Sequence, residues 1–387
     1  MTKYDFTTLP NRLTHHTYKW KETETDPEII PAWIADMDFN VIPEVREAVI
    51  GYADQMVYGY TYASDSLYQS ILDWEKEEHG YSFDKEAIVF IEGVVPAIST
   101  AIQAFTKEGD AVLINTPVYP PFARSVKLNR RKLIENSLVE KDGLFQIDFD
   151  QLEKDIVEQD VKLYVLCNPH NPGGRVWDRG VLEKIGHLCQ KHGVLLVSDE
   201  IHQDLALYGH RHTSFNTVDP SFKDFSFILT SATKTFNIAG TKNSYVVIEN
   251  PKLRTAFKQR QLANNQHEIS GLGYIATEAA YRYGKSWLTE LKQVFEKHID
   301  YVIDELHEKT HIRVMKPQGT YLLWLDFSAY PYTDDELHAK IHDQAKLILN
   351  RGTDFGKEGT LHARLNVAAP FTLIEEITKR LVDTFHK

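Results

Sequence analysis

The strongest constraint on the fold is a regular alternation of strand and helix patterns between residues 86 and 250. Short runs rich in valine, isoleucine and leucine are separated by longer stretches whose apolar residues recur at helical spacing. Such an alternation is typical of a mostly parallel sheet with helices on both faces. We therefore predict an α/β fold with a large domain built around a mostly parallel seven-stranded sheet. Its strands are expected at 88–91, 111–114, 132–136, 163–166, 194–198, 227–230 and 245–248.

The rest of the chain predicts a second, smaller domain. After Gly284 apolar residues recur at helical spacing, which indicates a long connecting helix. An α+β unit follows, with strands expected at 312–315 and 321–326, a helix near 334–349 and a final helix from Leu373. We expect residues 48–284 to form the large domain, whereas residues 1–47 and 285–387 together form the small α+β domain.

Composition and charge narrow the kinds of partner. The formal net charge of -12 repels polyanions and no basic run offsets it, so we expect no nucleic-acid partner. No apolar stretch reaches the roughly 18 residues of a membrane helix. No signal-peptide pattern opens the sequence either, so a cytoplasmic protein without membrane contacts is expected. The two cysteines and 17 histidines lack the spacing of a disulfide framework or a metal site, which leaves a small molecule as the expected partner.

One lysine lies where ligands bind in open α/β sheets. The run Ser231-Ala-Thr-Lys-Thr-Phe-Asn-Ile-Ala-Gly240 follows a predicted strand, which places Lys234 on a turn at the carboxyl edge of the sheet. Taken alone, such a lysine is more often an exposed surface residue. The polar motifs that follow other strands make a reactive lysine the better hypothesis.

Three further strands also end in residues that could carry chemistry. Asp199 closes an apolar strand, where it could cap a helix or hold a protonated pyridine nitrogen. Asn171 lies in Asn168-Pro-His-Asn-Pro-Gly-Gly174, which could equally be a plain turn. Gly93 opens a predicted helix, whose first backbone amides could bind a phosphate group.

Taken in order, these motifs resemble the class I and II aminotransferase superfamily across nearly the whole chain. The matching positions are Gly93, Tyr119 in Thr116-Pro-Val-Tyr-Pro, Asn171, Asp199, Lys234 and Arg364 in His362-Ala-Arg-Leu-Asn366. The resemblance implies the type I fold of enzymes that use pyridoxal 5'-phosphate (PLP), with PLP as the cofactor. It also implies a homodimer whose active sites lie at the subunit interface.

The resemblance further implies a role for each matching residue. As catalytic residues, Lys234 is expected to bind PLP covalently, Asp199 to pair with its pyridine nitrogen, and Tyr119 to stack on its ring. Arg364 is expected to bind the substrate carboxylate, with Ala35 beside it. The other residues expected to bind the cofactor are Gly93, Val94, Val95, Asn171, His202, Ser231 and Lys242, together with Tyr60 of the neighbouring subunit. Tyr58 could take the place of Tyr60, and simple packing is the alternative for either tyrosine.

Three features narrow the resemblance to the MalY/PatB group of cystathionine β-lyases. They are Trp33-Ile-Ala-Asp-Met-Asp-Phe39, Val57-Tyr-Gly-Tyr-Thr61, and Asp199-Glu-Ile-His202, where many aminotransferases have tyrosine in place of His202. The group implies a carbon–sulfur β-lyase that cleaves L-cystathionine or related cysteine thioethers to a thiol, pyruvate and ammonia. The alternatives are an aminotransferase for neutral or aromatic amino acids, and a protein that keeps the fold for binding or regulation without catalysis.

Overall fold

The computed structural model describes residues 3–387 and has a seven-stranded sheet at its centre. In spatial order its strands are β2 (Ile88–Ile91), β10 (Ser244–Val247), β9 (Ser226–Thr230), β8 (Leu195–Asp199), β7 (Val161–Cys167), β3 (Ala111–Thr116) and β4 (Lys132–Ser137). All pairings are parallel except those that β10 makes with β2 and β9. The predicted mostly parallel sheet is confirmed, and each of the seven apolar runs forms one of its strands.

The antiparallel strand β10 determines which segments meet at one edge of the sheet. Because β10 runs opposite to both neighbours, β2 and β9 point in the same direction. The register places Ser244, at the start of β10, opposite Ile91 at the end of β2. It places Tyr245 opposite Thr230, the last residue of β9. The segments that follow β2 and β9 therefore gather with the segment that precedes β10 at the carboxyl edge, where ligands of such sheets bind.

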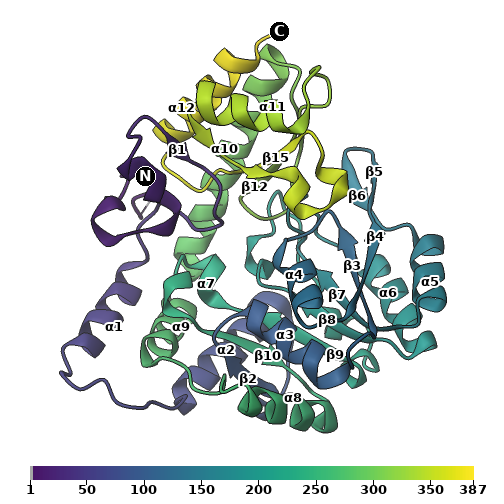
Figure 1. Ribbon diagram of the computed structural model, residues 1–387. Coiled ribbons are helices and arrows are strands. Elements are labelled where there is room, and N and C mark those ends of the chain that lie inside the picture. The colour runs from purple at the N-terminus through teal and green to yellow at the C-terminus, as the bar shows by residue number, and fades with distance from the viewer. Residues whose placement is uncertain (1–2) are drawn as a thin grey trace.

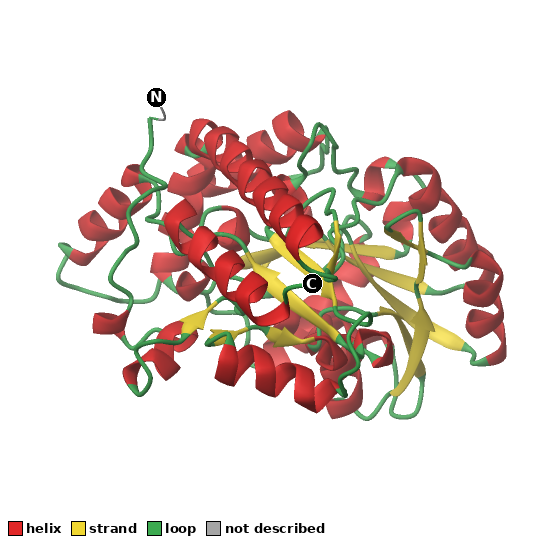
Figure 2. Ribbon diagram, turned by 90° about the horizontal axis from the view of Figure 1, so that it is seen from above, coloured by secondary structure: helices red, strands yellow, loops and turns green. Residues whose placement is uncertain are grey.

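Helices cover both faces of this sheet, as Figures 1 and 2 show. Strands buried on both faces are nearly continuous apolar runs, and every residue of β2, β3, β9 and β10 is buried. The helices of this part are α1 (Pro43–Ala53), α2 (Asp65–His79), α3 (Val94–Phe105), α4 (Pro121–Leu128), α5 (Phe149–Glu158), α6 (Arg179–His192), α7 (Ala232–Thr235), α8 (Pro251–Ala263) and α9 (Gly271–Tyr283). Among the helices of residues 3–387, none has the length and apolarity that crossing a bilayer requires.

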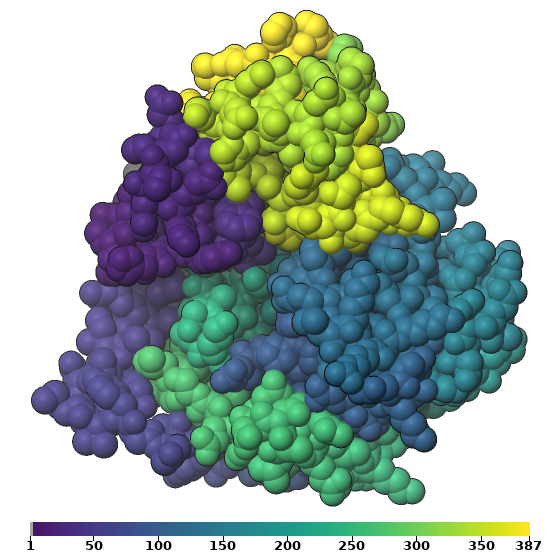
Figure 3. Space-filling model, in the orientation of Figure 1, coloured from purple at the N-terminus to yellow at the C-terminus, as the bar shows by residue number. Residues whose placement is uncertain are grey.

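The C-terminal part of the chain forms a second sheet (Figure 1). Its elements are β11 (Arg313–Met315), β12 (Leu322–Asp326), β15 (His362–Asn366) and β14 (Asn350–Arg351), with α10 (Lys285–Lys309), α11 (Asp334–Ala339) and α12 (Phe371–Phe385). The N-terminal segment joins this part, because β1 (Ile30–Pro31) pairs in parallel with β13 (Leu347–Ile348). Figure 3 shows the purple N-terminal and yellow C-terminal segments side by side. The domain boundaries at 47/48 and 284/285 stay predictions.

One predicted element is wrong in its extent. The helix expected near 334–349 ends as an α-helix at Ala339, continues as a π-helix over Lys340–Gln344 and then gives way to β13. The apolar residues near its end fit helical spacing, but their backbone pairs with β1, which is distant in sequence. Such long-range pairing overrides local spacing. A hairpin of β5 (Val139–Lys141) and β6 (Leu144–Gln146) also lay outside the predicted elements.

Helix α6 contains a glycine whose position leaves no room for a side chain. A Cβ atom on Gly186 would lie 2.0 Å from the ring of Phe222, which is buried and stacks on Phe215. We expect Gly186→Ala to lower the free energy of unfolding by about 1–3 kcal/mol, the usual cost of overpacking a core. The matched control is Gly180→Ala in the same helix, where the nearest atom would be 3.6 Å away. Chemical denaturation compares the two variants, and equal stabilities would contradict this account of the packing.

Candidate active site

Lys234 lies in α7, a single helical turn directly after β9. Its Nζ donates a hydrogen bond of 2.6 Å to the backbone oxygen of Ala35. Burial lowers the pKa of the Lys234 ammonium from 10.5 to about 8, although the charges of Asp36 and Asp199 oppose this effect. A lysine with such a pKa loses its proton close to neutral pH, as a nucleophile or general base must.

Asp199 is the last residue of β8 and is only 2% exposed. Its Oδ1 accepts a hydrogen bond of 3.1 Å from the backbone N–H of Ile201, but the next helical turn begins only at Gln203, so Asp199 does not cap a helix. Burial raises the pKa of the Asp199 carboxyl to about 7, and the nearby Lys234 offsets only some of this shift. No ion pair within residues 3–387 involves Asp199. A cation bound next to this buried carboxyl would lower its pKa and stabilise its charged form.

Arg364 lies in β15 and is only 3% exposed, although arginine side chains are mostly exposed in proteins. Its Nη1 donates to Asn171 Oδ1 at 3.0 Å, and its Nη2 donates to the backbone oxygen of Trp33 at 2.9 Å and to Asn350 Oδ1 at 2.6 Å. Its Nε has no partner among the described residues, and burial lowers its pKa to about 10. A guanidinium held only by neutral oxygens keeps its charge available for an anion.

The segment 33–39 lies against the lysine turn and is fixed through its backbone. Ala35, which accepts the lysine's hydrogen bond, also accepts one of 3.1 Å from the Tyr321 hydroxyl. Asn366 donates two hydrogen bonds of 2.7 Å to backbone oxygens of the segment, and Asn237 donates two of 2.9 Å. The motif that narrowed the family resemblance therefore borders the site.

His202 and Tyr119 also lie close to this centre. His202 is 3% exposed, and its Nδ1 has no partner among the described residues. Burial lowers the pKa of His202 to about 3, so its ring is neutral at physiological pH. Tyr119 is partly buried, and its backbone N–H donates to the backbone oxygen of Asn171 at 3.1 Å. Burial raises the pKa of the Tyr119 hydroxyl while the charge of Arg364 opposes that shift, so both rings can contact a ligand without adding charge.

The predicted phosphate-binding residues meet at the sheet edge defined by β10. Gly93 is the N-cap of α3, whose first turn contains Val94 and Val95, while Ser231 is the N-cap of α7. Lys242 is exposed and lies just before β10. Backbone amides at a helix start attract anions, so the arrangement is compatible with a phosphate, and these roles stay predictions.

The hydroxyl group of Ser231 already has a structural role. Its Oγ accepts a hydrogen bond of 3.1 Å from the backbone N–H of Thr233 and lies 2.7 Å from the backbone oxygen of Asn243. Ser231 thus caps the turn that carries the reactive lysine and ties it to the strand beside it. Any contact of this hydroxyl with a ligand would be additional to that role.

The chain by itself does not bring Tyr60 to the site. Tyr60 is 95% exposed and Tyr58 66% exposed, so packing within the subunit does not account for Tyr60. Tyr58 donates a hydrogen bond of 2.6 Å to the backbone oxygen of Ala53. The expected contact of Tyr60 with a neighbouring subunit stays a prediction.

Sequence analysis missed three polar residues that position the site, namely Tyr321, Asn237 and Asn366. Tyr321 was expected only as a strand residue, whereas Asn237 and Asn366 belong to the quoted lysine and arginine motifs. Tyr321 and Asn366 are fully or almost fully buried. For the two asparagines, a polar side chain inside a motif was the available signal, because buried polar groups must find hydrogen-bond partners.

The chain is similar in sequence and structure to PLP-dependent enzymes. The family model described as aminotransferase class I and II matches residues 34–381. Cystathionine beta-lyase PatB of Bacillus subtilis (strain 168) is 39% identical, over 97% of this chain and 98% of its own. The structure of cystalysin from Treponema denticola, which contains PLP, has a TM-score of 0.95 and 36% identity over 98% of each chain. The PLP-bound C-S lyase from Staphylococcus hominis has a TM-score of 0.92 and 28% identity, over 100% of this chain and 99% of that one. The predicted resemblance and fold type are confirmed.

Proposed function

Because the chain belongs to the class I and II aminotransferase family, we propose that it is a PLP-dependent carbon–sulfur β-lyase acting on L-cystathionine or a related cysteine thioether. The products of that reaction are a thiol, pyruvate and ammonia. The observation that carries the proposal is the 39% identity, over 97% of the chain, to a protein named cystathionine beta-lyase. The contacts and charges of the site support the same chemistry.

The side chains of the site fit PLP. Asp199 is a buried carboxyl that forms no ion pair with residues 3–387, and a protonated pyridine nitrogen would supply such a cation. Lys234 is an amine of lowered pKa, which suits covalent attachment to an aldehyde. Tyr119 offers a ring for stacking, and Asn171 an amide for the ring oxygen. Bound PLP supplies an electron sink for the charge that develops when a proton leaves the substrate Cα.

We assign the transfer of the Cα proton to Lys234. With a pKa of about 8, its Nζ is neutral in a sizeable fraction of molecules near neutral pH and can accept that proton. The hydrogen bond to Ala35 holds Nζ beside segment 33–39 rather than in solvent. General base catalysis of this kind contributes roughly 10²–10⁴-fold to a rate. Beside the protonated pyridine nitrogen of PLP, Asp199 would stay charged. Its negative charge would keep the proton on that nitrogen.

The exposed segment around Tyr60 supports the proposal of a homodimer. Met56, Val57, Tyr60 and Tyr62 are 74% to 95% exposed, and they follow one another closely in sequence. Contiguous apolar exposure of this kind marks a surface that contacts another protein. In a homodimer, Tyr60 reaches the phosphate group bound by the neighbouring subunit.

The competing function within the family is transamination of neutral or aromatic amino acids. The two reactions differ in their need for a keto acid. Pyruvate, thiol and ammonia should be assayed with cystathionine, cysteine and cystine, in the presence and absence of an added keto acid. Release of all three products without the keto acid supports the lyase, whereas a strict requirement for the keto acid would show an aminotransferase.

Arg364→Ala is expected to raise KM for every amino-acid substrate. All candidate substrates share an α-carboxylate, and the loss of a charge-assisted hydrogen bond costs about 1.5–3 kcal/mol. This corresponds to roughly tenfold to more than a hundredfold in kcat/KM. Arg364→Lys should restore little, because a point charge cannot form the planar two-bond contact.

Steady-state kinetics measure this effect, and the absorbance of the bound cofactor serves as the control. The variant should retain that absorbance, since none of the hydrogen bonds of Arg364 goes to Lys234, which binds the cofactor covalently. An unchanged kcat/KM with cystathionine would remove Arg364 from the substrate site.

A further inference from the structure

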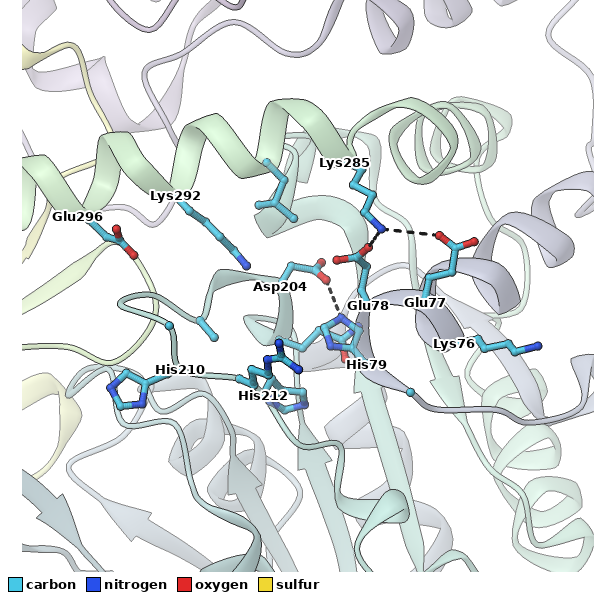
Figure 4. A pocket seen from close by; sticks show the side chains of 16 residues that line it. Lys76, Glu77, Glu78, His79, Asp204, His210, His212, Lys285, Lys292 and Glu296 are labelled. Atoms are coloured by element: carbon cyan, nitrogen blue, oxygen red, sulfur yellow. Dashed lines mark hydrogen bonds and ion pairs between the residues drawn. The ribbon is translucent and has the colours of Figure 1, made fainter. Parts of the chain in front are cut away.

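A cavity lies apart from the residues assigned to the reaction. Its volume is about 750 Å³, and it is bordered by the end of α2, the loop 203–212 and the first half of α10. Figure 4 shows Lys285, Lys292 and Glu296 extending from α10, with Asp204 and His79 across from them. Lys234 and Arg364 do not line this cavity.

Asp204 closes one side of the cavity and is fully satisfied. It is 3% exposed and accepts hydrogen bonds of 2.7 Å from His79, 3.0 Å from Trp74 Nε1 and 2.6 Å from the Thr235 hydroxyl. Burial alone lowers the pKa of His79, but its hydrogen bond to Asp204 and that carboxylate's charge raise the pKa above its usual value. His79 is therefore the cation that pairs with Asp204.

The other acids at the cavity are also engaged. Glu78 pairs with Lys285 at 2.5 Å, and Glu77 lies 3.8 Å from the same amine. Glu296 accepts a hydrogen bond of 2.5 Å from the backbone N–H of Tyr208. Lys285 thus serves both neighbouring glutamates, whereas Glu296 keeps its charge and is held by a neutral backbone N–H.

Three positively charged side chains at the same cavity form no ion pair with residues 3–387. They are Lys76, Arg211 and Lys292. Lys292 is the most informative, because it is partly buried and Figure 4 shows its amine directed into the cavity. Burial lowers the pKa of Lys292 in spite of the acids around it. A partly buried ammonium gains more from a bound anion than an exposed one does.

We propose that this cavity binds a small multivalent anion through Lys292 and Arg211, and that the binding is transmitted to Lys234 through Asp204. The volume is within the range of small-molecule sites and leaves room for a molecule larger than the anionic group itself. The path from the cavity to Lys234 is short. Thr235 donates a hydrogen bond to Asp204, and Thr235 is the residue after Lys234 in α7. The site is separate from the one that binds substrate.

Binding is tested by calorimetric titration of the PLP-loaded enzyme with inorganic phosphate at constant ionic strength. The loaded enzyme is used so that the cofactor's own phosphate group fills its site. One phosphate site per chain is expected, and Lys292→Met combined with Arg211→Gln should weaken it at least tenfold. The matched control is Lys297→Met, because Lys297 lies on the same helix with its amine 4.3 Å from the ring centre of Phe371. Absence of binding, or equal affinity in the double variant, would overturn the proposal.

A second titration identifies the anionic group. Malonate is titrated into the Arg364→Ala enzyme, where a dicarboxylate cannot be held by that guanidinium. Saturable binding of malonate alone supports a carboxylate ligand, and binding of phosphate alone supports a phosphate ligand. Binding of either anion must be lost in the Lys292 and Arg211 double variant. If neither malonate nor phosphate binds, the proposed site is refuted.

The link to Lys234 is tested by kinetics with and without saturating phosphate. In the parent enzyme phosphate should change kcat/KM at least twofold. Thr235→Val removes the hydrogen bond to Asp204, so phosphate should still bind while its effect on kcat/KM disappears. Thr235→Ser keeps the hydroxyl and should keep the effect. Phosphate that binds the parent enzyme without changing kcat/KM would refute the link.

Discussion

Replacing Lys234 by alanine is expected to abolish turnover. Its Nζ bonds the backbone oxygen of Ala35 and interacts with the charge of Asp199, and its pKa of about 8 fits a base working near neutral pH. Loss of a general base alone costs roughly 10²–10⁴-fold, and covalent attachment of the cofactor is lost as well, so kcat should fall by at least about 10³-fold. Product release from cystathionine, measured at high enzyme concentration, gives the residual rate.

The control is Lys242→Ala, which removes an exposed amine eight positions further along the chain. This variant should lower the affinity for PLP without removing the reactive lysine, so activity should return at high PLP concentration. Borohydride reduction of the loaded parent enzyme, followed by peptide mapping, should find the pyridoxyl group on Lys234. Recovery of the label on Lys242 would show that the reactive lysine had been assigned wrongly.

The central sheet could be predicted from the sequence because its strands are buried on both faces. Strand β2 consists entirely of apolar residues, and β3 begins with four of them, because both strands are buried on both faces. The short strands β13 and β14 could not be predicted, since two residues carry no periodic pattern. They exist because other strands supply their hydrogen-bond partners: β1, which is distant in sequence, pairs with β13, and β15 pairs with β14.

Some residues of the candidate site could be predicted from the sequence and others could not. Lys234 and Asp199 could be found because each directly follows or ends an apolar strand, and the sheet edge brings such positions together. The position of Arg364 beside Asn171 could not be derived in this way, since β15 belongs to a different sheet. Nor could the hydrogen bond from Tyr321 to Ala35, which joins residues 286 positions apart.

Asp199→Ala is expected to leave PLP bound and to remove most of the activity. The contacts expected to hold the phosphate group lie after β2 and β9, so the variant leaves them intact. Without the carboxylate, nothing in the site favours the protonated form of the pyridine nitrogen, because an opposite charge is what raises that pKa. Loss of one group that stabilises charge in a buried active site lowers kcat by roughly 10²–10³-fold. We therefore expect kcat to fall by about that factor.

Asp199→Asn tests whether the charge of Asp199 or only its shape matters, and Glu200→Gln is the control at a neighbouring carboxylate. Asp199→Asn keeps the side chain's volume but not its charge, so it should be as impaired as the alanine variant. Glu200 is the adjacent buried carboxylate, but it is engaged by His212 and Ser198 instead of facing Lys234. Glu200→Gln is expected to lose stability while each folded molecule retains most of its turnover. Near-normal kcat in Asp199→Asn would show that the charge of Asp199 does not drive the reaction.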